Sequence, residues 1–352
     1  MATREKHLLP QALAGQVIDI HAHVGISIKA YAATEFPCCQ SVEGLIYRQR
    51  ENGVQASVVF PFSADLYFDL PTLINAGRCE PAAAPLSPAP YEQENRMLMT
   101  EVFDFCPEHS STLLPFVSVD PLHDVPGQLA ALSLLEQNYS IYGIKISPVA
   151  CQAPVTCLLS EGAPLLDFAA ARDLPLLFHV TTHPEERFSQ LADTFEVVER
   201  HPELRFCLAH CLGFSLEFLG RAAAAPHVWV DTAALKIQTQ LANENSPITA
   251  LPADRPDLDY SDHTRVLQQL VNRYPKTIIW GSDSPYYSFI SRRMQAPGQY
   301  SEFRLKATYE DEKAALDALS GKAYWQVCNA NSRRFLFGTR PCHKEDIRTP
   351  VE

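Results

Sequence analysis

The chain has no long apolar run and no excess of basic residues. No stretch of 18 consecutive apolar residues occurs among its 352 residues, so we expect no membrane-spanning helix. Its formal net charge is −12, from 41 acidic residues against 29 Lys and Arg. Because nucleic acids and anionic membranes favour basic surfaces, we expect neither as a partner.

The N-terminus also lacks the pattern of a secretory signal. Its opening stretch, MATREKHLLPQALAGQ, has no apolar core of the length that such a signal needs. We therefore expect a cytoplasmic protein whose 10 cysteines are mostly reduced thiols. The cysteines show no zinc-ribbon spacing, which favours small buried side chains over a cysteine-ligated metal.

Short apolar, β-branched runs are what the sequence does contain, and helical patterns lie between many of them. Eight runs are typical of strands: VIDIHAH (17–23), ASVVFPF (56–62), LLPFVSV (113–119), YGIKIS (142–147), PLLFHV (175–180), RFCLAHC (205–211), HVWVDT (227–232) and TIIWGSD (277–283). Ser41 and Gly53 bound one predicted helix, and two others end at Pro202 and Pro275 (185–202 and 262–275).

Strands that alternate with helices predict parallel pairing through right-handed crossovers. Eight such units predict an α/β protein with a closed (β/α)8 TIM barrel. We expect one domain over residues 1–352, with an N-terminal arm at 1–15 and a C-terminal tail at 340–352. A doubly wound open sheet is the alternative, but it usually has a Gly-rich turn after its first strand, and DIHAHVGIS lacks one.

Three connections that follow predicted strands are long. They come after strands 2, 7 and 8, at roughly 62–91, 233–261 and 284–309. Long loops in a compact domain are usually functional, so we expect lids and specificity loops over the catalytic end of the barrel.

Polar groups gather where the predicted strands end, and a barrel of this type carries its active site at that end. They are His21 and His23 on strand 1, Lys145 on strand 4, His179 on strand 5, His210 on strand 6 and Asp283 on strand 8. Alternate residues of a strand face one side, so His21 and His23 should point inward together. Imidazole and carboxylate groups suit a divalent metal, which we expect to be Zn²⁺, with Mn²⁺, Fe²⁺, Co²⁺ and Ni²⁺ left open.

These motifs resemble those of the amidohydrolase superfamily, and most closely the amidohydrolase-related (amidohydrolase 2) group of metal-dependent TIM-barrel hydrolases and decarboxylases. DIHAHVG is similar to the strand-one motif, and GIKIS to the strand-four lysine motif, although Ser147-Pro148 stands where His-Pro is usual. LLFHV, FCLAHC and IIWGSDSP are similar to the fifth, sixth and eighth strand motifs, and NANSRRFLFG (329–338) to the C-terminal helix signature. The resemblance implies a metal ion held by His21, His23, His179 and Asp283, with His210 beside it as a further ligand or a substrate contact.

The same constellation predicts a metal-dependent hydrolase that uses metal-activated water to cleave an amide, ester or lactone of a small molecule. Asp283 is expected to act as general base, and His210 to stabilise the oxyanion or protonate the leaving group. One alternative is a metal-dependent decarboxylase, a carbon–carbon lyase of a small carboxylated substrate. A second alternative is a non-catalytic barrel that serves as a binding protein.

Lys145 decides the expected number of metal ions. In some members of the superfamily a strand-four lysine is carbamylated and bridges two ions, and burial beside a cation would favour the neutral amine that this requires. Otherwise Lys145 pairs with an acid or a substrate carboxylate, or forms a structural contact at the barrel rim. We expect one ion, and two if Lys145 is carbamylated.

Five further residues are candidates with less specific roles. His183, Tyr286 and Lys236 are expected to contact substrate because they lie in loops or turns after the strands. Asp19 either orients a histidine ligand or forms a structural pair, and Asp231 either lines the pocket or makes a structural hydrogen bond. The resembled group also leads us to expect a homodimer.

Overall fold

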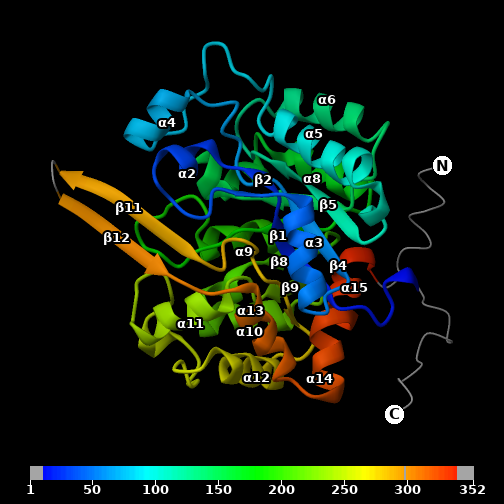
Figure 1. Ribbon diagram of the computed structural model, residues 1–352, viewed down its shortest axis with the longest axis vertical. Helices are drawn as coiled ribbons and strands as arrows, with labels where there is room; N and C mark the ends of the chain where they lie inside the picture. The colour runs from blue at the N-terminus through cyan, green and yellow to red at the C-terminus, as the bar shows by residue number, and fades with distance from the viewer. Residues whose placement is uncertain (1–10, 297–298, 339–352) are drawn as a thin grey trace.

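Eight parallel strands form the centre of the protein (Figure 1). The computed structural model describes residues 11–296 and 299–338. The strands pair in chain order and are the eight predicted ones: β1 (Ile18–His23), β4 (Ala56–Phe60), β5 (Leu113–Val119), β6 (Gly143–Ile146), β7 (Leu176–Phe178), β8 (Phe206–Leu208), β9 (Val228–Asp231) and β10 (Ile278–Ile279).

The segment after β10 returns to β1 and brings the two ends of the sheet together. The backbone N–H of Asp283 donates to the carbonyl oxygen of His21 at 2.8 Å. The N–H of His23 donates to the carbonyl oxygen of Ser284 at 2.7 Å. With helices between the strands, this arrangement confirms the predicted (β/α)8 barrel.

Alternate strand residues face the barrel interior and the surrounding helices, because side chains alternate along a strand. On β6, Ile144 and Ile146 pack in the layer between strands and helices, whereas the buried Lys145 between them faces the interior. Below the polar end, one apolar cluster fills the barrel: Ile18, Ile20, Val58, Phe60, Leu114, Phe116, Leu177, Cys207, Trp229 and Ile279, among others.

Helices cover the outside of the barrel (Figure 1). The main ones are α3 (Val42–Glu51), α5 (Glu92–Thr100), α6 (Val125–Leu135), α8 (Ala163–Ala171), α9 (Leu191–Arg200), α10 (Leu216–Ala224), α12 (His263–Arg273) and α15 (Asn331–Phe337). Ser41 caps α3 as predicted, accepting the N–H of Gly44 at 3.1 Å. The helix predicted over 185–202 begins only at Leu191, because the carboxylate of Glu186 accepts backbone N–H groups just before it and turns the chain there.

The three long connections carry secondary structure of their own. The first contains α4 (Leu70–Ala76), and the second contains α11 (Leu235–Asn243) and the short η5 (Pro252–Asp254). The third is an antiparallel hairpin of β11 (Phe289–Ala296) and β12 (Gln299–Leu305), the orange arm that extends from the body in Figure 1. The expected loops are therefore largely ordered elements that stand at the catalytic end.

The remaining elements are α13 (Tyr309–Asp317) and several short ones: β2 (Gly25–Ile26), α2 (Ile28–Ala32), β3 (Cys39–Gln40), η1 (Glu101–Phe105), η2 (Pro107–His109), α7 (Pro148–Cys151), η3 (Val155–Leu159), η4 (His210–Phe214), α14 (Gly321–Trp325) and η6 (Gln326–Ala330). None of the helices in the described part of the chain has the length and hydropathy that a membrane crossing needs.

The described part of the N-terminal segment packs against the barrel. Leu13 is buried in the interior cluster, and the side-chain amide of Asn329 donates to the carbonyl oxygens of Leu13 and Gln16 at 2.8 and 2.6 Å. The end of the predicted arm is thus fixed to the barrel by the interior cluster and by Asn329. Residues 1–10 of that arm and the predicted tail at 340–352 lie outside the described residues.

Candidate metal centre

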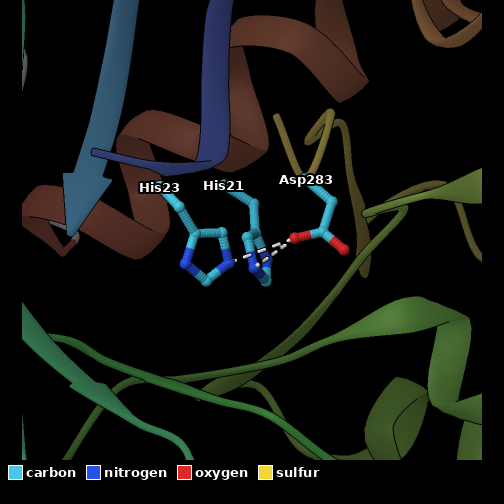
Figure 2. Close-up of side chains that lie close together, drawn as sticks. All are labelled: His21, His23 and Asp283. Carbon is cyan, nitrogen blue, oxygen red and sulfur yellow. Dashed lines mark ion pairs between the residues drawn. The ribbon is translucent and has the colours of Figure 1, made fainter. Parts of the chain in front are cut away.

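Three buried side chains from the first and last strands converge at the C-terminal end of the barrel (Figure 2). His21 and His23 end β1, and Asp283 follows β10. The Nε2 atoms of His21 and His23 each lie 3.2 Å from Oδ1 of Asp283. These are three of the residues that the sequence predicts as ligands.

The spacing of these atoms suits a single cation. Two ligands that each lie ~2.0–2.1 Å from a tetrahedral ion stand about 3.3 Å apart, close to the separations from Oδ1 of Asp283 to the two imidazole nitrogens. Two imidazoles with one carboxylate form a donor set that borderline divalent metals favour. The residues present therefore fit the metal that the resemblance implies.

The hydrogen bonds behind the two rings favour the same conclusion. Nδ1 of His21 lies 2.9 Å from Oδ2 of Asp231, and Nδ1 of His23 lies 3.4 Å from the carbonyl oxygen of Pro61. Both oxygens only accept hydrogen bonds, so the ring protons belong on Nδ1. Each Nε2 then presents a lone pair toward Asp283, an arrangement that a cation between them stabilises.

The charges around the three groups favour a positive charge at their centre. Burial and the charge of Lys145 lower the pKa of His21, but Asp231 and Asp283 together raise it by more, so the net pKa lies above its usual value. Burial lowers the pKa of His23 to about 4. Burial raises the pKa of Asp283, yet the charge on His21 and hydrogen bonds from the histidines lower it well below the usual range. The same pocket that attracts a proton to His21 would attract a metal ion.

Local backbone features bring β1 and the segment after β10 close together. The register of β1 shifts between Asp19 and Ala22, which places Ile20 inside the barrel and Ala22 on the helix side. A Cβ on Gly281 would lie 2.9 Å from Cβ of His21, so only glycine allows this approach. Asp283 itself has a φ of 62°, a left-handed conformation that costs free energy in a residue with a side chain.

Asp19 and Asp231, for which the sequence leaves two roles open, have different hydrogen-bond partners. Asp19 accepts hydrogen bonds from the backbone and hydroxyl of Ser282 at 2.9 and 2.6 Å and from the hydroxyl of Tyr309 at 2.8 Å. It also accepts the backbone N–H of His21 at 3.1 Å, so it ties β1 to the segment after β10 and to α13, as the structural alternative expects. Asp231 is the acid that orients the His21 ring, and it also accepts the backbone N–H of His210 at 3.0 Å.

His179 and His210 lie beside this group and bind each other. Nδ1 of His210 lies 3.1 Å from the carbonyl oxygen of Ala233, and its Nε2 lies 3.0 Å from Nδ1 of His179. The carbonyl places the proton of His210 on Nδ1, so its Nε2 accepts from His179, whose own Nε2 stays unprotonated. Burial lowers the pKa of both rings.

The expected roles of these two histidines stay predictions. His179 lies outside the group of three whose ligand atoms all fall within 4.8 Å of one another, so the structure does not bring it in as a fourth ligand. Neutral His210 has both nitrogens engaged and keeps no N–H for a substrate. It sits at the start of η4, where φ values of 51° to 62° make a left-handed turn, a rare and strained conformation.

Lys145 occupies the floor of the same site. Its Nζ lies 3.3 Å from Nε2 of His21 and 4.7 Å from the centroid of the Phe60 ring. Burial lowers the pKa of Lys145 to about 8, although Asp231 and Asp283 oppose this shift. The amine is thus buried in the interior and does not form the structural contact at the rim.

A cavity of about 640 Å³ opens above these residues. Its polar lining includes the histidines, Asp283, Lys145, Ser27, Lys29, Glu35, Ser63, Asp65, Ser147, Thr181, Gln238, Tyr286 and Ser291. Its apolar lining includes Phe62, Val149, Val180, Ile237, Leu241, Ile248, Phe289, Phe303 and Leu305. The volume is that of a small-molecule site.

The amidohydrolase family profile, of the amidohydrolase 2 type, matches residues 18–337. The chain belongs to the amidohydrolase family. Members of this family are metal-dependent enzymes, among them hydrolases and decarboxylases, and His21, His23 and Asp283 form a group that could hold a metal ion. No curated protein sequence matches this family member closely enough to count as a relative.

Solved structures with the same fold include several enzymes. 2,6-Dihydroxybenzoate decarboxylase from Rhizobium has 10% sequence identity and a TM-score of 0.57, over 91% of this chain and 98% of that one. A probable 2-pyrone-4,6-dicarboxylic acid hydrolase from Acinetobacter baumannii has 14% identity and a TM-score of 0.53, over 92% and 99%. An uncharacterized TIM-barrel protein from Bordetella bronchiseptica has 12% identity and a TM-score of 0.55, over 91% and 98%. At such identities the likeness shows the fold of this amidohydrolase.

Of the three predicted substrate contacts, only Tyr286 lines the cavity of this amidohydrolase, with its ring centroid 5.0 Å from that of His23. Lys236 does not line it, because its Nζ pairs with Asp311 at 2.7 Å and its backbone N–H donates to Glu312. His183 does not line it either, and its Nδ1 accepts the backbone N–H of Glu185 at 3.2 Å. The expected contacts of Lys236 and His183 with substrate stay predictions, although neither residue lines the cavity.

Proposed function

We propose that the protein is a metal-dependent hydrolase that cleaves an amide, ester or lactone of a small molecule. The observation that carries the proposal is that the two carboxylate oxygens of Asp283 have different surroundings. Oδ1 meets both imidazoles, whereas Oδ2 lies 3.8 Å from Nδ1 of His210, too far for a hydrogen bond. Oδ2 is therefore placed to accept a proton at the cavity.

The residues around the cavity supply the steps of such a reaction. A divalent ion held by His21, His23 and Asp283 would polarise the substrate carbonyl and make water acidic enough to react near neutral pH. Asp283 accepts the proton of the attacking water on Oδ2, which faces the cavity. Lys145 carries its N–H groups into the same cavity and can donate one to the developing oxyanion.

A decarboxylase is the second candidate, and Lys145 is the observation that favours it. An ammonium group on the cavity floor, 3.3 Å from Nε2 of His21, can pair with a substrate carboxylate. The Rhizobium decarboxylase shows that the fold supports this chemistry. Release of CO₂ from carboxylated aromatics, measured beside bond hydrolysis, separates the two candidates.

The proposal is tested with purified protein loaded with Zn²⁺ and with Mn²⁺, assayed on panels of amides, esters and lactones. We expect hydrolysis that a chelator abolishes and that returned metal restores. Asp283→Asn should lower kcat by ~10²–10⁴ if Asp283 is the general base. Asp257→Asn, at an exposed position, is the matched control and should keep full activity.

Two outcomes would contradict the hydrolase. The first is a protein that binds no divalent metal after loading, which would favour the non-catalytic binding protein. The second is turnover of wild-type rate in Asp283→Asn with unchanged metal content. A cytoplasmic location, a small-molecule substrate, a homodimer, and the absence of nucleic-acid or membrane partners remain part of the proposal, and size-exclusion chromatography with light scattering tests the dimer.

A further inference from the structure

One apolar wall closes a side of the cavity above the metal centre. It is formed by α11 and by the β11–β12 hairpin, which stand on the same side of the barrel in Figure 1. Both belong to the long connections after the last two barrel strands, so they are particular additions to the barrel and not part of its repeating units. What this wall accepts therefore defines the substrate of this chain.

The helical part of the wall is one face of α11. Ala234, Ile237, Gln238 and Leu241 line the cavity, at the spacing of residues that share one helix face. Ile237 and Leu241 are both almost fully buried. The first turn of the helix is fixed by the buried carboxyl of Glu312, which accepts its backbone N–H groups at 2.8 and 3.1 Å. The face is consequently held rigidly.

The hairpin part of the wall is one face of a two-stranded sheet. Phe289 pairs with Leu305 and Ser291 pairs with Phe303, and all four line the cavity. Directly opposed pairs two residues apart share a face, so the hairpin turns three apolar side chains and one hydroxyl toward the site. The rings of Phe289 and Phe303 meet edge to face at 6.4 Å.

The charged group that contacts the wall is an acid, because the carboxylate of Glu35 accepts a hydrogen bond from the hydroxyl of Ser291 at 3.2 Å. Lys145 and Asp283 lie on the floor, and Lys29 lies with Asp65 and Glu35 at the side formed by the loops after β1 and β4. The backbone N–H of Lys29 donates to Asp65 at 2.9 Å. Acidic groups thus outnumber lysines in the lining, and no arginine lines the cavity among the residues that the structure describes.

A carboxylate on the distal part of a substrate would face this wall without a cationic partner. Burying an unpaired ion against apolar side chains is strongly unfavourable, whereas a ring or branched alkyl group gains from the same contact. We propose that the substrate is uncharged, with a carbonyl at the metal centre and an apolar ring or branched alkyl group packed between α11 and the hairpin. This inference rests on the proposed hydrolase and names its substrate class.

The binding test uses two ketones that have no bond to hydrolyse, 4-isopropylacetophenone and 4-carboxyacetophenone. The isopropyl and carboxylate groups have similar size, so charge is the main difference between the two ligands. Calorimetric titration of the Zn²⁺-loaded protein should give a Kd at least ~100-fold lower for the isopropyl compound, because the carboxylate would be buried without a partner. The matched esters, 4-isopropylphenyl acetate and 4-carboxyphenyl acetate, should show the same order in kcat/KM.

Variants test whether the wall causes the preference for the isopropyl compound over the carboxylated one. Phe303→Arg, at a position that is 38% exposed and should tolerate the change, is expected to reduce the preference at least ~10-fold by offering the carboxylate a partner. Ile237→Arg makes the same change from the helix side. Tyr47→Arg, exposed on α3 outside the cavity, is the matched control and should leave the preference unchanged.

The outcomes separate this inference from the function on which it rests. Equal or tighter binding of the carboxylated ketone, or failure of both ketones to bind, overturns the uncharged substrate class even if the esters are hydrolysed. An unchanged preference in a folded Phe303→Arg and in Ile237→Arg overturns the role of the wall. Tight binding of the isopropyl ketone without metal-dependent hydrolysis of any ester, amide or lactone supports the substrate class and overturns the hydrolase.

Discussion

The carboxylate of Asp231 lies 2.9 Å from Nδ1 of His21, at the end of β9, and this contact sets which ring nitrogen of His21 faces the cavity without a proton. A carboxylate can only accept, so Nδ1 carries the proton and Nε2 remains a ligand atom. Strand β9, which lies two places from β1 in the closed barrel, thus controls the chemistry of the first strand through a single hydrogen bond.

Asp231→Asn should weaken metal binding by ~10–100-fold, because the amide can present N–H to Nδ1 and favour the wrong tautomer of His21. Chelator competition followed by metal analysis measures the change. Asp167→Asn, on the exposed face of α8, should bind metal as the wild type does. Wild-type metal affinity in a folded Asp231→Asn would show that the ring is oriented by other contacts.

The metal content should be one ion per chain, and independent of bicarbonate. Lys145 stands 3.3 Å from Nε2 of His21 as a buried amine, and the described residues contain one group of ligands with the required spacing. Metal analysis with and without bicarbonate, on wild type and Lys145→Met, tests this. Two ions per chain in bicarbonate, reduced to one in Lys145→Met, would instead establish a bridging carbamate.

Gly281→Ala should disturb the metal centre more than the fold. The new methyl group would lie 2.9 Å from Cβ of His21 and 3.3 Å from its backbone nitrogen, so the ligand must move. We expect a loss of at least ~10-fold in metal affinity, measured by chelator competition, since ligand orientation controls affinity to that extent. Gly220→Ala, with open space around its Cβ position inside α10, should be neutral or stabilise by ~0.5–1 kcal/mol. Equal metal affinity in both variants would refute the steric argument.

The free energy of unfolding should depend on pH through Glu94. Burial raises the pKa of Glu94 to about 7, Asp65 adds to the shift, and Oε2 has no hydrogen-bond partner among the described residues. Because the pKa of Glu94 is higher in the folded state than in the unfolded state, protonation of Glu94 stabilises the folded protein. This contribution to the free energy of unfolding is complete below about pH 4.5 and is lost as the pH rises through 7.

Glu94→Gln removes that titration. Relative to this variant, the wild type should lose about 1–2 kcal/mol of stability between pH 5 and pH 8, with the shift discounted for partial exposure. Denaturant unfolding of both proteins at both pH values measures how much more the free energy of unfolding changes with pH in the wild type than in Glu94→Gln. Glu92→Gln, in the same helix turn, is the matched control, and an equal effect in both variants would assign the pH dependence to general charge repulsion.

The barrel and most of its site follow from local patterns. Apolar runs of strand length locate all eight strands because a parallel sheet buries both faces, and the polar residues near the ends of five of these runs locate the active end. His21, His23 and Asp283 meet as predicted because strand ends in a closed barrel must lie on one rim.

Features that depend on contacts across the barrel could not be predicted in this way. The register shift in β1 has no mark in the sequence. Because of it, Asp19 and His21 do not share one face of the strand, and Asp19 bonds to Ser282 whereas His21 bonds to Asp231. The hairpin at 289–305 was open to prediction from its alternating residues, but its catalytic-side position suggested a loop. Lys236 looked available to substrate because the carboxylates of α13 that bind it come from a distant segment.

The position of the ligands at the junction of the first and last strands has a consequence for synthesis of the chain. A nascent protein with seven strands would already contain His21 and His23, but it would lack the carboxylate that completes the set. Metal capture is thereby confined to the finished barrel. A ligand that binds only the completed form stabilises that form. An ion at His21, His23 and Asp283 would therefore stabilise the contact between β1 and the segment after β10, which is the last barrel contact to be synthesised.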